Sequence, residues 1–431
     1  MKHNPLPAEL FIYNRQRFAA KLPLGSMAIF HSNDVMPRSG DTFFPFRQNS
    51  DLFYLCGIEQ EESILVLFPA CMKQGFEEVL FIRRPSEKLL RYEGEQLTEH
   101  KARRISGVKQ IRWLDEYEEL LRELLLLSER VFVNVEEHDR FHSPISSRNL
   151  RMTQQLKQQF PAHRYERSGP ILKELRMIKS PAEVDAIQQA INITGEAFTE
   201  LMKMLEPGVK EYEVEACITG SFIRQGAAGH AYTPIVASGA NTCVLHYTRN
   251  KQVCREGELL LMDFGAEFCN YAADLSRTIP VSGRFTERQR VVYDAVLRVQ
   301  RAAISLLLPG VNLEEYHVEV GRLMEAELLK LGLLDAQMIK AQDPKQPAYK
   351  QYFMHGTSHH LGLDVHDAGF RYAAVEAGMA FTCEPAIYIP EEKIGIRLEN
   401  NILVTENGPR DLTKRIPIEA EEIEEWMNTG Q

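Results

Sequence analysis

The feature that most constrains this chain is the stretch from Asp263 to Glu399, in which two similar segments flank a histidine-rich loop. The first segment, LLLMDFGAEFCNYAADLSRTIPV, has two apolar runs around a short polar turn, a pattern typical of a β-hairpin. If the hairpin closes at its midpoint, Phe268–Cys269, Asp263 and Asp274 lie opposite each other on one face. The sequence therefore predicts a cross-strand pair of aspartates.

A second segment repeats this design further along the chain. It reads MAFTCEPAIYIPEEKIGIRLENNILVT, and the midpoint between its Glu384 and Glu399 falls at Glu391–Glu392, in a polar turn after Pro390. These two glutamates are predicted to form a second cross-strand pair. Between the two segments lies HGTSHHLGLDVHD, residues 355–367, which contains four histidines.

Four acids and a histidine from three segments would repel one another unless positive charge lay among them. Each like-charge pair about 4 Å apart near a protein surface costs on the order of 4 kcal/mol. Two divalent cations would balance the four acids, and pairs of metal ions about 3.5–4 Å apart recur in hydrolytic enzymes. An oxygen-rich donor set with a single imidazole favours a hard ion such as Mn²⁺, with Co²⁺ or Zn²⁺ as alternatives.

The order of these motifs resembles that of a known enzyme family. D-F-G-(x)8-D is followed by H-G-x-S-H-x-x-G-L-x-V-H-D and then by C-E-P and R-L-E. The same order is found in the dinuclear pita-bread metallopeptidases, which include methionine aminopeptidase, aminopeptidase P and prolidase. The resemblance implies five metal ligands, which are Asp263, Asp274, His359, Glu384 and Glu399. It also implies that Asp274 and Glu399 bridge the two ions.

The resemblance also assigns catalytic roles. Water held between two cations loses a proton near neutral pH and attacks the scissile carbonyl, and Glu384 would pass that proton to the leaving nitrogen. His246, in LHYTRN, and His366, in LDVHD, would hydrogen-bond the substrate and the tetrahedral oxyanion. The alternative for either histidine is a purely structural role. Alternation along an extended segment points His360 away from His359, so His360 is expected to line or pack.

The resemblance also covers His355, Tyr388 and Arg397. In the family, residues at such positions contact the substrate residue after the scissile bond or support the metal ligands. Arg397 lies two residues before Glu399, so alternation places both on one face of a strand. A fixed cation there would orient Asp263 or Glu399. The alternative is an ordinary surface arginine.

Length indicates two domains, because 431 residues exceed one ordinary hydrophobic core. The resemblance, together with strands that alternate with helices, gives an N-terminal α/β domain over residues 1–170 and a catalytic pita-bread domain over residues 171–431. The overall class is α/β (α+β). Residues 161–170, PAHRYERSGP, are predicted to form the linker because prolines flank a polar middle.

Local patterns place the elements. The runs SMAIFHS, DLFYLCG, ESILVLFPA, EVLFIRR and RVFVNVE predict strands, and DEYEELLRELLLLSER and RNLRMTQQLKQQF predict amphipathic helices. In the second part, Ser180 with Glu183 and Thr286 with Gln289 predict capping boxes that open long helices. Helix pairs that alternate with the two hairpins suggest an internal duplication, as in the pita-bread fold.

Composition restricts the partners and the compartment. A net charge of −10 argues against nucleic acid as the main partner, and no segment approaches the apolar length of a membrane span or a signal peptide. Seven scattered cysteines without a C-x-x-C motif fit a reduced cytoplasm. The resemblance implies a homo-oligomer, either a dimer or a tetramer.

The resemblance implies the function of an Xaa-Pro aminopeptidase (aminopeptidase P), which removes the N-terminal residue from peptides with proline at the second position. The N-terminal segment with FPFRQNSDLFYL and the LHYTRN motif favour this member of the family over methionine aminopeptidase. Because a proline nitrogen carries no hydrogen and has a fixed φ, such bonds need a specialised site. One alternative is prolidase, which cuts only Xaa-Pro dipeptides. Another is a metal-free relative, either a creatinase-like amidinohydrolase or a binding module. The full ligand set argues against the metal-free alternatives.

Overall fold

The computed structural model describes residues 5–138 and 143–429, which fall into two compact units that meet between Arg176 and Met177. Both units combine helices with sheets, so the predicted α/β class is confirmed. No described helix has both the length and the apolar character needed to cross a bilayer.

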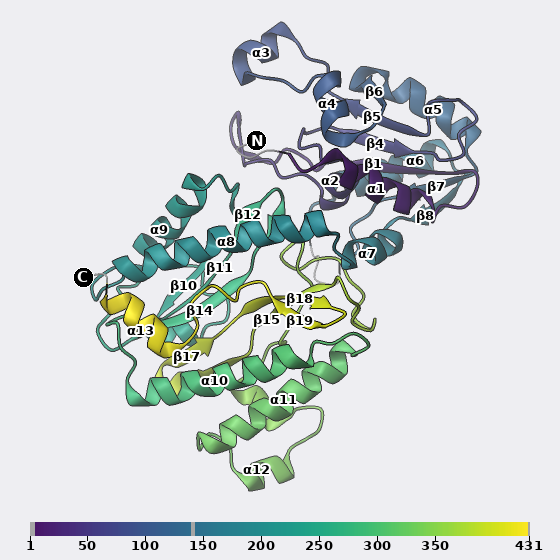
Figure 1. The fold of residues 1–431 in the computed structure, drawn as a ribbon. Coiled ribbons are helices and arrows are strands. Elements are labelled where there is room, and N and C mark those ends of the chain that lie inside the picture. The colour runs from purple at the N-terminus through teal and green to yellow at the C-terminus, as the bar shows by residue number, and fades with distance from the viewer. Residues whose placement is uncertain (1–4, 139–142, 430–431) are drawn as a thin grey trace. The chain divides into compact units, whose positions relative to one another are not determined.

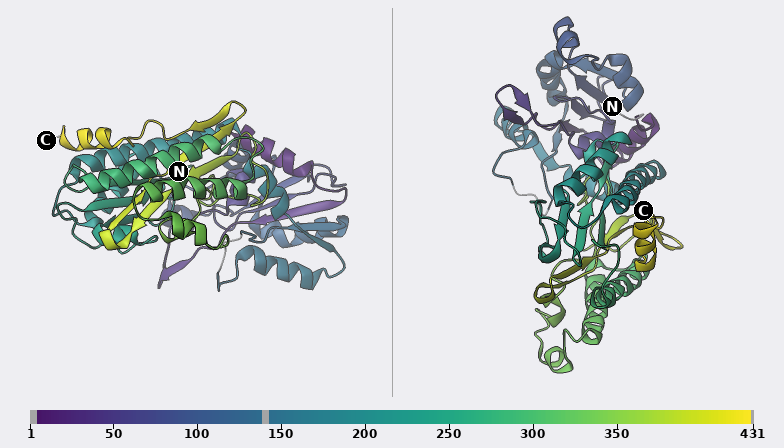
Figure 2. Two further views of the ribbon diagram at one scale, coloured as in Figure 1. Left: turned by 90° about the horizontal axis from the view of Figure 1, so that it is seen from below. Right: turned by 90° about the vertical axis from the view of Figure 1, so that its left-hand side faces the viewer.

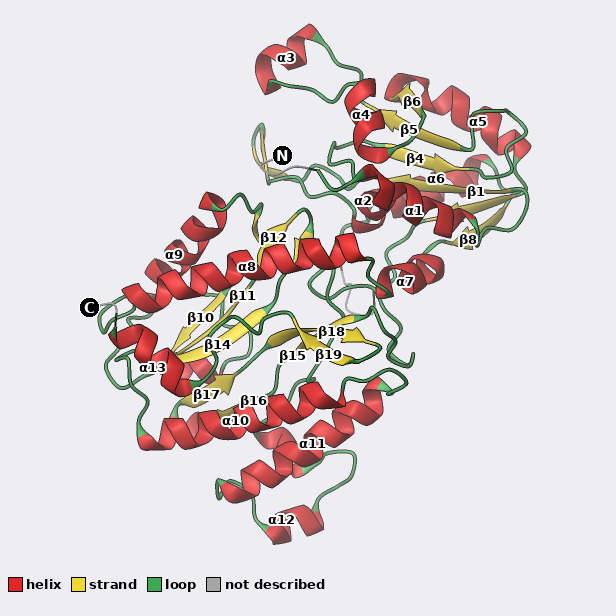
Figure 3. Cartoon of the chain, in the orientation of Figure 1, coloured by secondary structure: helices red, strands yellow, loops and turns green. Residues whose placement is uncertain are grey.

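The first unit contains a six-stranded sheet in the order β6-β5-β4-β1-β7-β8. Neighbours β1 and β7, β7 and β8, and β5 and β6 are parallel, whereas β4 is antiparallel to both of its neighbours. Helices α5 and α6 contribute apolar side chains to the core on this sheet, and Figure 3 shows the strands with helices beside them. The strands are β1 (Ser26–His31), β2 (Pro37–Ser39), β3 (Thr42–Phe43), β4 (Ile64–Leu67), β5 (Glu78–Ile82), β6 (Gln110–Trp113), β7 (Arg130–Val133) and β8 (Arg164–Arg167). The helices are α1 (Ala8–Ala19), α2 (Ser50–Cys56), α3 (Glu87–Glu93), α4 (Glu99–Ser106), α5 (Tyr117–Leu127), α6 (Arg148–Gln159) and α7 (Gly169–Met177).

The predicted strand DLFYLCG is wrong, because these residues form helix α2. The Asn49 side chain accepts a hydrogen bond from the Leu52 N–H at the start of the helix, and Gly57 ends it in the left-handed conformation. Five consecutive side chains from Leu52 to Cys56 are buried, so the run shows no helical alternation in the sequence. The two capping residues, and not periodicity, were the available signal for a helix.

The predicted linker is also wrong. Residues 164–167 form β8, which pairs in parallel with β7, and α7 follows at Gly169. The sequence of β8 is RYER, and its side chains are half-buried or exposed because the strand lies at the edge of the sheet. Charged residues are common on edge strands, and here they resemble a polar connection.

In the second unit, the long helices α8 and α10 run alongside the strands, and α11 lies next to α10 (Figures 1 and 2). The predicted capping boxes at Ser180 and Thr286 are confirmed. The helices are α8 (Pro181–Met204), α9 (Glu211–Arg224), α10 (Glu287–Leu306), α11 (Leu313–Lys330), α12 (Ala336–Ala341) and α13 (Ala420–Asn428). The strands are β9 (Gly229–His230), β10 (Ile235–Ser238), β11 (Leu259–Phe264), β12 (Ala266–Phe268), β13 (Tyr271–Ala272), β14 (Leu275–Pro280), β15 (Ala380–Cys383), β16 (Ala386–Ile389), β17 (Ile394–Arg397), β18 (Asn400–Thr405) and β19 (Gly408–Asp411).

The first predicted hairpin exists, but its register differs from the prediction. Its turn is Cys269–Asn270, where both residues have positive φ values of 51° and 62°. Asparagine tolerates this conformation, which two-residue hairpin turns require. The turn is therefore centred one residue later than expected, and Asp263 pairs with Ser276. Asp274 is two residues from Ser276, so the two aspartates are diagonal neighbours on one face and not a direct pair.

The register of the second hairpin is confirmed. Cys383 pairs with Asn400 on one side, and Ala386 pairs with Arg397 on the other. Glu384 and Glu399 lie between these two pairings in the same register, so they face each other across the hairpin as predicted.

Gly265 sets the spacing of the first hairpin, because a Cβ atom added there would lie 1.8 Å from the carbonyl oxygen of Ala273. We expect Gly265→Ala to force the two strands apart, to lower the free energy of unfolding by about 1–3 kcal/mol and to reduce activity. Denaturant unfolding measures the effect. Gly220→Ala is the matched control, since its nearest neighbour is the flexible Arg224 side chain at 3.4 Å. Equal stability of the two variants would contradict the assigned role of Gly265.

Candidate active site

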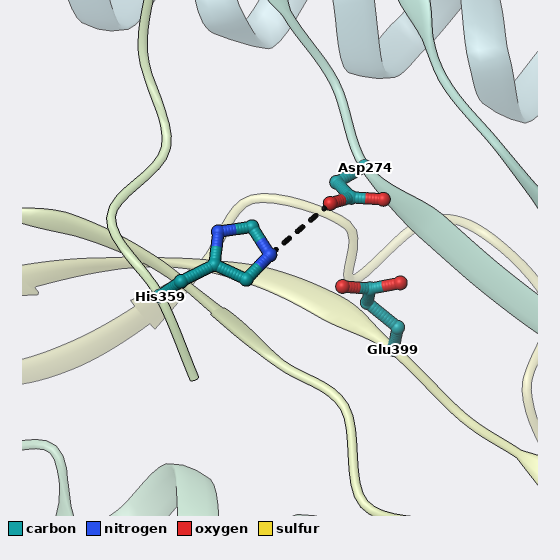
Figure 4. Close-up of side chains that lie close together, drawn as sticks. All are labelled: Asp274, His359 and Glu399. Carbon is teal, nitrogen blue, oxygen red and sulfur yellow. Dashed lines mark ion pairs between the residues drawn. The ribbon is translucent and has the colours of Figure 1, made fainter. Parts of the chain in front are cut away.

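Side chains from three separate segments of the second unit come close together. Asp274 follows β13, His359 lies in the histidine-rich loop, and Glu399 precedes β18. One ligand atom from each of these residues lies within 4.8 Å of the others, as Figure 4 shows. The distance from His359 Nε2 to Asp274 Oδ2 is 3.4 Å.

The other two predicted ligands join this cluster. Glu384 Oε1 lies 3.7 Å from His359 Nε2. The hydroxyl of Tyr232 lies 2.6 Å from Asp263 Oδ1 and 2.5 Å from Asp274 Oδ1, so it connects the two aspartates. The structure therefore brings all five predicted ligands together.

Burial makes the negative charge of the cluster unfavourable. Glu399 is 1% exposed, and burial, followed by the charges of its acidic neighbours, raises its pKa well above the ordinary value. Burial also raises the pKa of Asp263, and it raises the pKa of Glu384 to about 7. Without added positive charge these carboxylates cannot all be ionised at neutral pH.

The contacts of Tyr232 lead to the same conclusion. A phenol has one proton, yet its oxygen is within hydrogen-bond distance of two carboxylate oxygens. One of these oxygens, on Asp263 or Asp274, therefore needs a proton or a cation of its own. Four carboxylates and one imidazole form a donor set suited to hard divalent cations.

Arg397 is buried and is held by three protein groups. Its Nη2 donates to Asp263 Oδ2 at 2.6 Å, and its Nη1 and Nε donate to the hydroxyls of Tyr388 at 2.8 Å and Ser276 at 2.7 Å. The arginine is 4% exposed, so the surface alternative is wrong. Its guanidinium fixes the orientation of Asp263, one of the two carboxylates anticipated from the sequence.

His355 and Tyr388 form a wall beside Glu384. His355 Nε2 is 3.0 Å from the Tyr388 hydroxyl, its Nδ1 is 2.8 Å from the carbonyl oxygen of Gly356, and Nδ1 lies 3.7 Å from Glu384 Oε2. Burial, with a contribution from Arg397, lowers the pKa of His355 to about 4, so the ring is neutral at physiological pH.

The remaining predicted histidines occupy different environments. The ring of His366 packs edge-on against His359 with centroids 4.4 Å apart. His246 is exposed, and its charge helps to lower the pKa of His355, after the larger effects of burial and Arg397. His360 packs on Phe381 with ring centroids 4.5 Å apart, and the prediction that it lines or packs is confirmed.

Sequence reasoning missed several polar residues that hydrogen-bond to the predicted ligands. Tyr232 lies outside every motif. Ser276 donates to Glu399 Oε2 at 2.9 Å, and the Asn401 amide oxygen accepts from the Asp274 N–H at 3.1 Å. A corrected hairpin register would have found Ser276, because it pairs with Asp263, whereas no local pattern marks Tyr232.

Comparison with known proteins identifies the family. Residues 185–406 match the model of metallopeptidase family M24, and residues 11–132 match that of the aminopeptidase P N-terminal domain. The chain belongs to metallopeptidase family M24. An Xaa-Pro aminopeptidase of Haemophilus influenzae is similar to it at 35% identity, over 98% of this chain and 98% of the relative.

Solved structures of M24 enzymes agree along the whole chain. The structure of a putative aminopeptidase P from Bacillus anthracis superposes on this chain with a TM-score of 0.92 at 30% identity. The match covers 99% of this chain and 99% of that one. The zinc-substituted E. coli aminopeptidase P in complex with product has a TM-score of 0.88 at 33% identity, over 99% of this chain and 100% of that one.

These matches confirm the predicted pita-bread fold after an aminopeptidase P N-terminal domain. The chain is a metallo-aminopeptidase of the Xaa-Pro type, and membership of family M24 implies that it binds divalent metal.

The Arg397 contacts generate a prediction. We expect Arg397→Lys to lower both metal retention and kcat, because one ammonium group cannot satisfy Asp263, Tyr388 and Ser276 together. Metal analysis and steady-state kinetics on a tripeptide with proline at the second position measure these effects. The control is Arg298→Lys, since Arg298 is 53% exposed and its ion pair with Glu327 lies outside this cluster. Unchanged metal content and kcat in Arg397→Lys would contradict the orienting role.

Proposed function

We propose that this M24 enzyme removes the N-terminal residue from peptides whose second residue is proline, with two divalent cations held by Asp263, Asp274, His359, Glu384 and Glu399. The observation that carries the proposal is the convergence of four carboxylates and one imidazole in a largely buried cluster. Asp274 and Glu399, the two most buried of the acids, would bridge the ions.

The cations would lower the pKa of a water molecule and polarise the substrate carbonyl. Mn²⁺ is the ion that this oxygen-rich donor set favours, with Co²⁺ and Zn²⁺ as alternatives. Tyr232, Ser276 and Arg397 would hold the ligands in place from outside the cluster.

We assign the proton transfer to Glu384. Its side chain is 20% exposed, compared with 7% for Asp274, so Glu384 is the more accessible of these two acids. Glu384 would accept the proton of the nucleophilic water and deliver it to the leaving nitrogen. His366 and His246 would donate hydrogen bonds to the substrate and to the developing oxyanion.

The His355 side chain, which is 20% exposed, would contact the proline ring, with the buried rings of Tyr388 and Phe353 packed beside it. Tyr388 and His355 lie with ring centroids 5.7 Å apart, and Phe353 packs edge-on against His355 at 5.0 Å. Arg397 Nη1 donates a hydrogen bond to the Tyr388 hydroxyl at 2.8 Å and holds it in place. The proline ring offers no N–H, so a flat apolar surface suits it better than a polar pocket.

The compartment and the assembly are also part of the proposal. All seven cysteines are free, which supports a reducing cytoplasm. We place the enzyme there as a homo-oligomer, a dimer or a tetramer, that acts on peptides and not on nucleic acid.

Substrate length distinguishes the proposed activity from that of prolidase. We expect Ala-Pro-Ala to be cleaved with a kcat/KM at least about tenfold above that of Ala-Pro, and Ala-Ala-Ala to be a poor substrate. Release of alanine measures all three rates under identical metal loading. Preferential cleavage of the dipeptide would replace the proposal with prolidase activity, and equal cleavage of Ala-Ala-Ala would show that the enzyme does not require proline at the second position.

Two variants distinguish the residues proposed to bind metal from those proposed to contact substrate. We expect Asp274→Asn to lose bound metal and nearly all turnover, because it removes negative charge from a residue proposed to bridge the two ions. We expect His366→Ala to lower kcat by about 10²-fold with metal content unchanged. Elemental analysis of the purified proteins and steady-state kinetics give both readouts. Full activity of Asp274→Asn, or loss of metal from His366→Ala, would show that the roles are misassigned.

A further inference from the structure

Glu211, the first residue of α9, is a buried acid outside the proposed metal site. It is fully buried. Its Oε1 accepts hydrogen bonds from the Ser238 N–H at 2.8 Å and the Ser238 Oγ at 2.7 Å. Its Oε2 accepts from the Tyr247 hydroxyl and from the Gln252 N–H, both at 2.8 Å. The carboxylate therefore receives four hydrogen bonds from neutral groups.

The four donors belong to one segment, residues 238–252, and they lie at its two ends and next to His246. Ser238 is the last residue of β10 and the first of the segment, Gln252 is its last residue, and Tyr247 directly follows His246. The Glu211 N–H also donates to the carbonyl oxygen of Gln252 at 2.9 Å. One side chain thus closes the segment into a loop and fixes the residue beside His246.

Other contacts hold the same loop elsewhere. Asn250 donates to Glu215 Oε2 at 2.9 Å, one turn along α9. The hydroxyl of Thr242 accepts from the Gly395 N–H at 2.9 Å, on the strand that carries Arg397. His246 itself is exposed, so its position depends on these anchors and, through its neighbour Tyr247, most directly on Glu211.

We infer that Glu211 is a positioning residue for His246. It acts by holding Ser238, Tyr247 and Gln252 on one carboxylate, which keeps the loop in the shape that presents the imidazole to substrate. The inference rests on the proposed role of His246 as a substrate contact. A carboxylate suits the task because it accepts at both oxygens and offers no proton of its own.

Glu211→Gln tests this idea with little change in volume. The amide keeps one acceptor oxygen and turns the other position into a donor, which faces either the two Ser238 donors or those of Tyr247 and Gln252. We expect kcat/KM for Ala-Pro-Ala to fall by about tenfold or more, because small misplacements of a catalytic group are costly. Metal content should not change.

A double-mutant cycle with His246→Ala separates positioning from general damage. If Glu211 acts through His246, the double variant Glu211→Gln/His246→Ala is no slower than His246→Ala alone. If Glu211 only supports the fold, the two losses multiply, and that result overturns the inference. Wild-type kcat/KM in Glu211→Gln also overturns it. Glu213→Gln, which removes the same charge at an exposed capping position of α9, is the matched control.

Failure of the inference can be told apart from failure of the proposed function. If His246→Ala keeps full activity, the proposed role of His246 is wrong and the inference falls with it. If His246→Ala is impaired while Glu211→Gln is not, only the inference is wrong. Should Glu211→Gln fail to fold, Tyr247→Phe enters the same cycle, since it removes only the hydroxyl that links Glu211 to the neighbour of His246.

Discussion

The concentration of negative charge at the centre of the second unit is the constraint on which the rest of the site depends. Asp263, Asp274, Glu384 and Glu399 lie close together with little solvent, where each like-charge contact costs on the order of 4 kcal/mol. Burial raises the pKa of Glu399 well above its ordinary value, so the cluster is under electrostatic stress in the folded chain. The fold has to hold these acids together despite their repulsion, and divalent cations are the natural counter-charge.

Hydrogen-bond donors next to the cluster hold the acids in place. Arg277 is fully buried and donates to the backbone oxygens of Ser276, Glu399 and Pro417, so it ties the two hairpins together. Burial lowers the pKa of Arg277 to about 10, and it therefore stays charged at neutral pH. In addition, the Glu399 N–H donates to the Ser276 carbonyl oxygen at 3.1 Å. The carboxylates are thus placed by contacts that do not themselves bind metal.

Strand alternation in the sequence predicts which residues of the site share a face. It does not predict positions that depend on the conformation of a turn or on contacts between distant segments. The facing pair Glu384 and Glu399 follows from a symmetric hairpin. The predicted register of the aspartate hairpin is one residue off. The turn forms at Cys269 and Asn270, which adopt the left-handed conformation, and not at the midpoint between the two aspartates. Tyr232 approaches the aspartates only through folding, so no local pattern marks it.

Outside the cluster of acids, too, local sequence predicts some elements correctly and fails where tertiary position decides. The sequence of helix α2 resembles a strand because burial on all sides removes the helical periodicity, and the sequence of β8 resembles a linker because an edge strand can be charged. Both errors arise where tertiary position, and not local sequence, sets the polarity of a segment. The motif-bearing residues were easier to place because catalytic chemistry restricts residue type and spacing together.

The histidine-rich loop shows how such placement is shared between distant elements. Tyr316 and His317, adjacent on α11, contact the two residues that precede His359: the Tyr316 hydroxyl lies 3.0 Å from Ser358 Oγ, and His317 Nδ1 accepts from the Thr357 N–H at 3.3 Å. The Thr357 carbonyl oxygen in turn accepts from the Glu384 N–H at 2.8 Å. Helix α11 therefore helps to position His359, a proposed metal ligand, and through Thr357 it also helps to position Glu384, the acid proposed to move the proton. Because each proposed reactive group is held by side chains from elsewhere in the chain, we expect substitutions of those side chains to affect catalysis by moving the reactive groups.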